Sequence, residues 1–179
     1  MEKTMRTFLV YVEDKPGVLN RVASLFRRRN YNIDSLNVGK TNEPGVSRMT
    51  IVCEANEDTA RRMQANLYKL VNVLRVDDIS EQASLERTLA LVKVRAGSES
   101  RPEIMRVCDT FRARIVDVGI DTVIVEATGA RHKIEALVEM LEPFGVLEMV
   151  ETGSVAMQRG AEGPGVMRCE RPKSTARAA

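Results

Sequence analysis

Tryptophan is absent from this sequence, and aromatic residues make up only 4% of it. A hydrophobic core must therefore be built from valine, leucine, isoleucine and methionine. The hydrophobic fraction of 44% and the charged fraction of 29% are typical of a soluble globular protein. No apolar run approaches the roughly 18 residues that a membrane-spanning helix needs, and no secretory signal is recognisable. We therefore expect a cytoplasmic protein.

Residue types that support catalysis or metal binding are also scarce. The single histidine, His132, begins a predicted helix without an evident catalytic partner, so we interpret it as a surface residue. The three cysteines lack metal-ligand spacing, and two of them, Cys53 and Cys108, fall in apolar patterns typical of reduced core residues. Neither a P-loop nor a G-x-G-x-x-G motif is present. We expect no catalytic residues, no metal ligands and no cofactor in this chain.

A large excess of one charge is missing as well. The 27 basic and 25 acidic residues give a net charge of +2, which is weak support for a nucleic-acid-binding protein. One basic cluster, Arg27 to Arg29, lies near the end of a predicted helix. Two interpretations remain open. Either the helix dipole alone accounts for these arginines, or they form a docking patch for an acidic partner.

Hydrophobic periodicity predicts a β-α-β-β-α-β unit over residues 4–79. In the first strand, residues 5–13, the side chains of Phe8, Val10 and Val12 share one face. The other expected elements are a helix from Val18 to Asn30 with core positions Val18, Leu19, Val22, Leu25 and Phe26, strands 33–39 and 46–54, a helix opened by Asn56 with core positions Ala60, Met63, Leu67 and Leu70, and strand 71–79.

The same order recurs over residues 85–158, after a short polar linker at 80–84. The expected elements are strand 85–96, helix 101–113, a hairpin of strands 114–118 and 122–127, a helix that stops at Pro143, and a single long strand 146–157. Residues 159–179 lose all periodicity, which predicts a mobile tail. The fold class is therefore α+β, with two ferredoxin-like units.

The segment from Asp14 to Leu36 is the strongest candidate for a binding site, and its first corner, Asp14 to Leu19, carries the argument. A strand leads into a helix start, where unpaired N–H groups and the helix dipole favour an anion. Gly17 lets a ligand approach the backbone closely, and the Asp14 carboxylate could accept an ammonium group. Such a corner suits a free amino acid. The alternative is purely structural, with Gly17 making a tight turn, Asp14 capping the helix and Pro16 lying in its first turn.

Several segments resemble one known family in combination. They are VEDKPGVLNRVASLFRRRNYNIDSLNVG (12–39), SRMTI (47–51), KLVNVLRV (69–76), LVKVRA (91–96), FRARIVDV (111–118) and TGSVAMQRG (152–160). Together they resemble the small regulatory subunit of acetolactate synthase, also called acetohydroxyacid synthase, over about residues 4–160.

This resemblance implies an N-terminal ACT domain that pairs with a second copy in a homodimer, followed by a smaller C-terminal ferredoxin-like domain. It implies a subunit without an active site, which binds a catalytic large subunit carrying thiamine diphosphate, magnesium and FAD. That holoenzyme is a transferase that joins two pyruvates to 2-acetolactate and CO₂ in branched-chain amino acid biosynthesis. The small subunit would activate it and confer feedback inhibition by valine. The alternatives are an amino-acid-responsive regulator of another enzyme or of transcription, and a small enzyme.

Carried over to matching positions, the resemblance implies a valine site made by two copies of the chain. One copy would contribute the corner residues, and its partner would contribute two residues that follow the first helix. These positions are Asp14, Gly17, Val18, Leu19 and Asn20 of one copy and Asn32 and Ile33 of the other.

Overall fold

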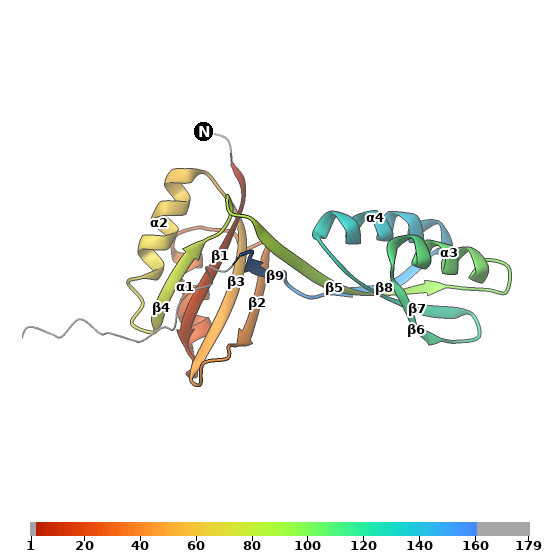
Figure 1. The fold of residues 1–179 in the computed structure, drawn as a ribbon, viewed down its shortest axis with the longest axis horizontal. Helices are drawn as coiled ribbons and strands as arrows, with labels where there is room; N and C mark the ends of the chain where they lie inside the picture. Colours follow the sequence, from red (N-terminus) through yellow and green to blue (C-terminus); the bar gives the residue numbers. More distant parts are fainter. Residues whose placement is uncertain (1–2, 161–179) are drawn as a thin grey trace, which may run out of the picture.

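The computed structural model describes residues 3–160 of the chain. Two lobes are visible in Figure 1, joined by one long strand that runs from the first into the second. Most of the predicted tail, together with Cys169, lies outside the described residues. No helix among residues 3–160 is both long and apolar enough to span a membrane.

The first lobe is a four-stranded antiparallel sheet with two helices on one face. Its strands lie in the order β2-β3-β1-β4. The elements are β1 (Thr4–Glu13), α1 (Val18–Arg28), β2 (Ser35–Lys40), β3 (Val46–Ala55), α2 (Glu57–Leu67) and β4 (Val73–Asp78).

The second lobe repeats the arrangement, with its strands in the order β6-β7-β5-β8. Its elements are β5 (Ser84–Arg95), α3 (Arg101–Phe111), β6 (Arg114–Val118), β7 (Thr122–Gly129), α4 (Arg131–Leu141), the short 3-10 helix η1 (Glu142–Phe144) and β8 (Val146–Glu151). The prediction of two ferredoxin-like units is therefore confirmed.

Apolar side chains at every second position of the central strands form the hydrophobic core of the first lobe. Phe8 lies opposite Ile51 and Val10 lies opposite Met49 in the pairing of β1 with β3, and all four are buried beneath the two helices. The buried face of α1 consists of Val18, Val22, Leu25 and Phe26, as the helical spacing predicts. The prediction was wrong for Leu19, which is exposed because it lies away from the sheet at the helix start.

The expected strand 146–157 is broken in the structure. Thr152 still pairs with β5, through its N–H to the Leu89 carbonyl at 2.9 Å, but the chain bends at Gly153 and Ser154 before β9 (Val155–Gln158) begins. Strand β9 then pairs with the start of β5, residues 84–87. The pattern predicted a single strand because it runs on across the break. Both pieces, β8 and β9, pair with the same strand, β5.

The returning segment attaches the second lobe to the first. Ala156 is buried against Leu9 and Tyr11 on the sheet face opposite the helices. At the bend, the backbone N–H of Ser154 donates to the Ser35 hydroxyl at 2.7 Å, and the Ser154 hydroxyl contacts Glu86. Strand β2 is therefore in direct contact with the chain that leaves β8.

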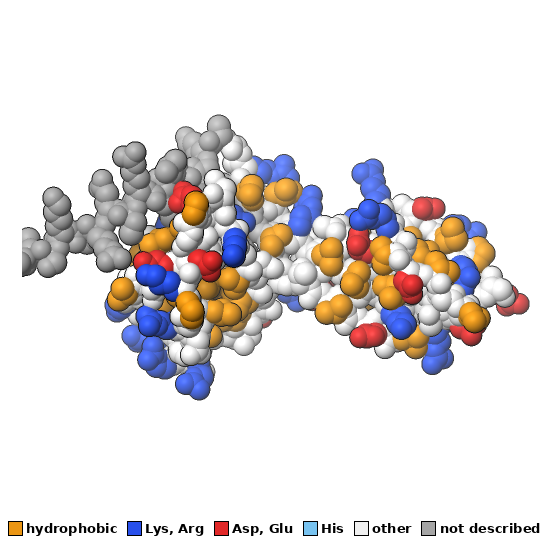
Figure 2. All heavy atoms as spheres, turned by 90° about the horizontal axis from the view of Figure 1, so that it is seen from below, with side chains coloured by type: hydrophobic (Ala, Val, Ile, Leu, Met, Phe, Trp, Pro, Cys, Tyr) orange, Lys and Arg blue, Asp and Glu red, His pale blue; other side chains and the backbone are white. Residues whose placement is uncertain are grey.

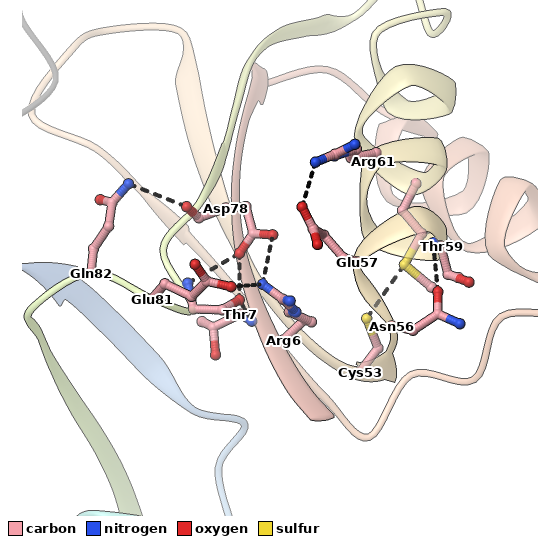
Figure 3. A network of polar contacts seen from close by, with 12 residues as sticks. Arg6, Thr7, Cys53, Asn56, Glu57, Thr59, Arg61, Asp78, Glu81 and Gln82 are labelled. Carbon is pink, nitrogen blue, oxygen red and sulfur yellow. Dashed lines mark hydrogen bonds and ion pairs between the residues drawn. The ribbon is translucent and has the colours of Figure 1, made fainter. Parts of the chain in front are cut away.

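The linker between the lobes is held by polar contacts with β1 (Figure 3). The Arg6 guanidinium lies 3.8 Å from the Asp78 carboxylate and 3.0 Å from that of Glu81. The backbone N–H of Thr7 donates to the Ser80 hydroxyl at 2.9 Å, and that hydroxyl also contacts Asp78. These contacts fix the path of the chain as it passes into β5.

Candidate functional site

The corner between β1 and α1 is a tight turn held by backbone hydrogen bonds. The N–H of Asp14 donates to the Gly45 carbonyl at 2.8 Å, and the N–H of Lys15 donates to the Glu13 carbonyl at 2.9 Å. Gly17 has a φ of 81°, in the left-handed region that favours glycine. An added Cβ at Gly17 would meet no atom within 4 Å, so the space beside this backbone is open.

The expected helix cap at Asp14 was wrong. The residue at the N-cap position is Gly17, and no side chain among residues 3–160 caps the helix start with a hydrogen bond. Pro16 lies before the N-cap, so it is not part of the first turn as expected. Gly17, in its left-handed conformation, is the last residue of the turn. The helix therefore begins at Val18, two residues after Pro16. Asp14 is left exposed at the rim of the corner.

The start of α1 offers hydrogen-bond donors without partners. The N–H of Val18 makes a long contact of 3.4 Å with the Lys15 carbonyl. The N–H groups of Leu19 and Asn20 donate to no acceptor within the described part of the chain. No acidic side chain lies in this first turn. An anion at the corner would therefore meet free donors and the positive end of the helix dipole.

A buried asparagine from another part of the chain supports the corner, and sequence reasoning missed it. Asn72 accepts a hydrogen bond from the Arg21 guanidinium at 2.7 Å and donates to the Glu13 carboxylate at 2.6 Å. The backbone carbonyl of Asn72 also accepts a hydrogen bond from the Glu13 N–H at 2.9 Å. Asn72 thus ties the end of β1 to the first turns of α1. No local sequence signal marks it, because its partners lie 51 and 59 residues away.

The other two predicted site residues follow the opposite end of α1. Asn30 has a φ of 55°, and the N–H of Tyr31 returns to the Phe26 carbonyl at 3.0 Å, which ends the helix. Asn32 is exposed and Ile33 packs partly against the core. The expected strand start at 33 was early by two residues, since β2 begins at Ser35.

One chain therefore does not bring all seven predicted residues together. Asp14, Gly17, Val18, Leu19 and Asn20 share the corner. Asn32 and Ile33 lie beyond an 11-residue helix, whose length is about 16 Å. Val18 is buried, so it can offer only its backbone. A site that includes both groups needs a second copy of the chain.

Two cavities lie elsewhere in the molecule. A groove of about 740 Å³ lies on the open face of the first sheet, lined by Leu9, Tyr11, Thr50 and, from β9, Val155 and Met157, among others. A second cavity of about 470 Å³ lies between the lobes, with a largely polar lining that includes Asp34, Glu86 and Arg131. Neither is lined by the corner residues.

Two of the three cysteines and the single histidine lie among the described residues. Cys53 and Cys108 are both buried, and burial raises the pKa of each thiol. His132 is exposed near the start of α4. Among residues 3–160, no group of three or more histidine, cysteine, aspartate or glutamate side chains could hold a metal ion.

Comparison with known proteins identifies both lobes. The family described as "AHAS small subunit-like ACT domain" matches residues 8–75, and the family described as "Small subunit of acetolactate synthase" matches residues 87–160. The chain is 49% identical over 162 residues to the acetolactate synthase small subunit of Mycobacterium leprae, covering 90% of this chain and 96% of that protein. It is 42% identical over 158 residues to the Bacillus subtilis small subunit, covering 88% and 92%.

A solved structure agrees over nearly the whole described chain. The crystal structure of the acetolactate synthase small subunit from Thermotoga maritima has a TM-score of 0.82 and 39% sequence identity, and the match covers 88% of this chain and 98% of that one. The first lobe is therefore an ACT domain. This chain belongs to the acetolactate synthase small-subunit family.

Proposed function

We propose that this chain activates the catalytic large subunit of acetolactate synthase and makes it sensitive to inhibition by valine. The observation that carries the proposal is the open corner at the start of α1, with its free N–H groups and exposed carboxylate, in a chain of this family. The corner would suit a small anion, whereas residues 3–160 offer no evident catalytic group.

The chemistry of the corner suits the zwitterion of an amino acid. The ligand carboxylate would accept hydrogen bonds from the N–H groups of Leu19 and Asn20, beside Gly17. Its ammonium group would lie near Asp14, whose side chain is exposed. The carboxylate of Asp14 also disfavours a second negative charge nearby, which would limit the affinity.

The second half of the site would come from a homodimer. Strand β2 is at the edge of its sheet and could pair with β2 of another copy. A two-fold axis perpendicular to the sheet makes the two β2 strands antiparallel, so the end of α1 in one copy approaches the start of α1 in the other. Asn32 would then face the ligand's ammonium group, and Ile33 its isopropyl group.

The chemistry itself would take place on the partner. The catalytic subunit would hold thiamine diphosphate, magnesium and FAD, and it would join two pyruvates to 2-acetolactate with release of CO₂. This chain would act through a coupling of about 1–3 kcal/mol between valine binding and the state of the partner, which changes an equilibrium by about 5- to 150-fold.

Reconstitution with the catalytic subunit tests the proposal. We expect this chain to raise acetolactate formation and valine to reverse the gain. The variant Gly17→Asp should lose valine inhibition and keep activation, because it places a carboxylate where the ligand carboxylate approaches. Gly17→Asn is the matched control, since asparagine tolerates the same backbone conformation without the charge. It should retain more inhibition than Gly17→Asp.

Calorimetry with valine on the purified chain adds an independent measurement. If valine neither binds the chain nor changes the activity of the reconstituted enzyme, the proposed regulation is wrong. If Gly17→Asp remains fully sensitive to valine, the regulation stands but the site lies elsewhere.

A further inference from the structure

The helix face of the ACT domain carries an unbalanced charge. Seven basic residues lie on α1, α2 and the turns that follow them, against two acidic residues, Glu57 and Asp58. We refer to this surface as the basic helix layer; it consists of Arg21, Arg27, Arg28, Arg29, Arg61, Arg62 and Lys69, all of them exposed. Lys and Arg side chains also gather along one margin of this lobe in Figure 2.

The rest of the chain has the opposite sign. The chain has 27 basic and 25 acidic residues. Without the seven residues of the basic helix layer and without Glu57 and Asp58, 20 basic and 23 acidic residues remain. Basic side chains elsewhere often have an acidic neighbour, as in the pairs of Arg75 with Asp77 and Arg131 with Glu135. The helix face of the ACT domain is therefore more positive than the protein as a whole.

Few charges of the basic helix layer are neutralised within the chain. Arg61 pairs with Glu57, and Arg21 bonds the uncharged Asn72. Arg27, Arg28, Arg29 and Arg62 form no ion pair with any described residue. These four guanidinium groups remain available to a partner.

Helix stability does not explain the pattern. The helix dipole favours Arg27 and Arg28 in the last turn of α1. It disfavours Arg21, near the start of the same helix, and it has little effect on Arg61 and Arg62 in the middle of α2. Arg21 bonds Asn72 and Arg61 pairs with Glu57, so among these three residues only Arg62 lies where the fold gains nothing from its charge.

Exposed apolar groups accompany the charges. The side chain of Val71, in the turn after α2, is 90% exposed, and that of Tyr68 is 52% exposed. Tyrosine and arginine are enriched among the residues that contribute most to protein interfaces. Val71 and Tyr68 therefore add apolar surface beside the charges of the basic helix layer.

We propose that the basic helix layer docks against an acidic surface of the catalytic large subunit. The inference rests on the proposed function for the identity of the partner, and on the charge distribution for the surface. In the dimer proposed above, the two-fold axis places both helix layers on the same side of a continuous sheet. The combined surface would then present twice the charge to one partner face, leaving the C-terminal domains outside the contact.

Charge reversal tests this surface. The variant carries Arg27→Glu and Arg62→Glu, one change on each helix. The matched control carries Arg106→Glu and Arg112→Glu, two exposed arginines of the C-terminal domain that form no ion pair among residues 3–160. Association with the purified catalytic subunit is followed by a surface-binding assay, and thermal melting of each variant confirms that it is folded.

We expect the layer variant to associate about tenfold more slowly than the wild type at low salt, because attraction between opposite charges accelerates encounter. The difference should shrink at about 0.5 M salt, where screening acts within a few ångströms. The control should associate like the wild type, and the affinity of the isolated chain for valine should be the same in all three proteins.

Two results would overturn the inference. One is a folded layer variant that associates as fast as the control, and the other is a wild-type association rate that does not depend on salt. Binding of the layer to anionic vesicles or to nucleic acid, with association to the catalytic subunit unaffected by charge reversal, would also assign the surface to another partner. Failure of the wild-type chain to bind the catalytic subunit at all would instead refute the proposed function.

Discussion

Replacing Gly153 by alanine places a methyl group where the returning chain passes closest to β2. A Cβ built at Gly153 would lie 2.3 Å from the carbonyl oxygen of Leu36, 2.6 Å from its carbonyl carbon and 3.0 Å from the backbone nitrogen of Asn37. Close carbon–oxygen contacts in proteins are about 3.3 Å or longer. The two backbone segments must therefore separate by about 1 Å, since no flexible side chain can yield.

The cost follows from what the separation disrupts. Strain from an added methyl group in a packed site is about 1–3 kcal/mol. The hydrogen bond from the Ser154 N–H to the Ser35 hydroxyl, at 2.7 Å, would also lengthen, at a further cost of about 0.5–1.5 kcal/mol. We expect a loss of about 2–4 kcal/mol in the contact between the returning segment and the ACT domain.

Hydrogen exchange locates the effect. In Gly153→Ala, the amides of residues 152–158 and of the first residues of β5 should exchange faster than in the wild type, because β9 pairs with that part of β5. Amides in the centre of β1 and β3 should change little. A thermal melt of the same variant should show a lower midpoint.

Gly39→Ala is the matched control. Gly39 lies in β2, and an added Cβ there meets no atom within 4 Å. Both variants reduce the entropy of the unfolded chain in the same way. If Gly153→Ala is as stable as Gly39→Ala, and its exchange pattern matches the wild type, the close contact between Gly153 and Leu36 does not constrain the fold.

Two further predictions concern buried polar and thiol groups of the ACT domain. Asn72→Leu should lower the free energy of unfolding by about 1–3 kcal/mol in urea denaturation, because it removes the bridge between Arg21 and Glu13; the exposed Asn42→Leu should change it far less, and equal effects would show that the bridge contributes nothing. Burial, with smaller contributions from Asp34 and Asp78, raises the pKa of the Cys53 thiol from 9.0 to about 11. The unfolded chain loses this proton at a lower pH than the folded chain, so the contribution to stability is complete below pH 9 and is lost as pH rises to about 11. The stability of Cys53→Ala should fall less steeply than that of the wild type across this window, and parallel pH profiles would contradict the assignment.

The sequence by itself determined both ferredoxin-like units and the position of the corner. Alternating positions such as Phe8 and Val10 predict a strand with one buried face, and the spacing of Val18, Val22 and Phe26 predicts a helix against it. These patterns are local, and burial follows from them wherever the element packs. The turn at Gly17 is also local, since its left-handed backbone strongly favours glycine.

Only the tertiary structure decided how the parts meet. The apolar pattern of residues 146–157 is compatible with one strand or with two. The break at Gly153 therefore depends on the nearby backbone of β2, which lies more than a hundred residues earlier. The role of Asn72 depends on Arg21 and Glu13, which reach it through the sheet. The separation of Ile33 from Gly17 depends on the path of α1 between them. These features arise from contacts between distant segments, which periodicity within a single segment does not encode.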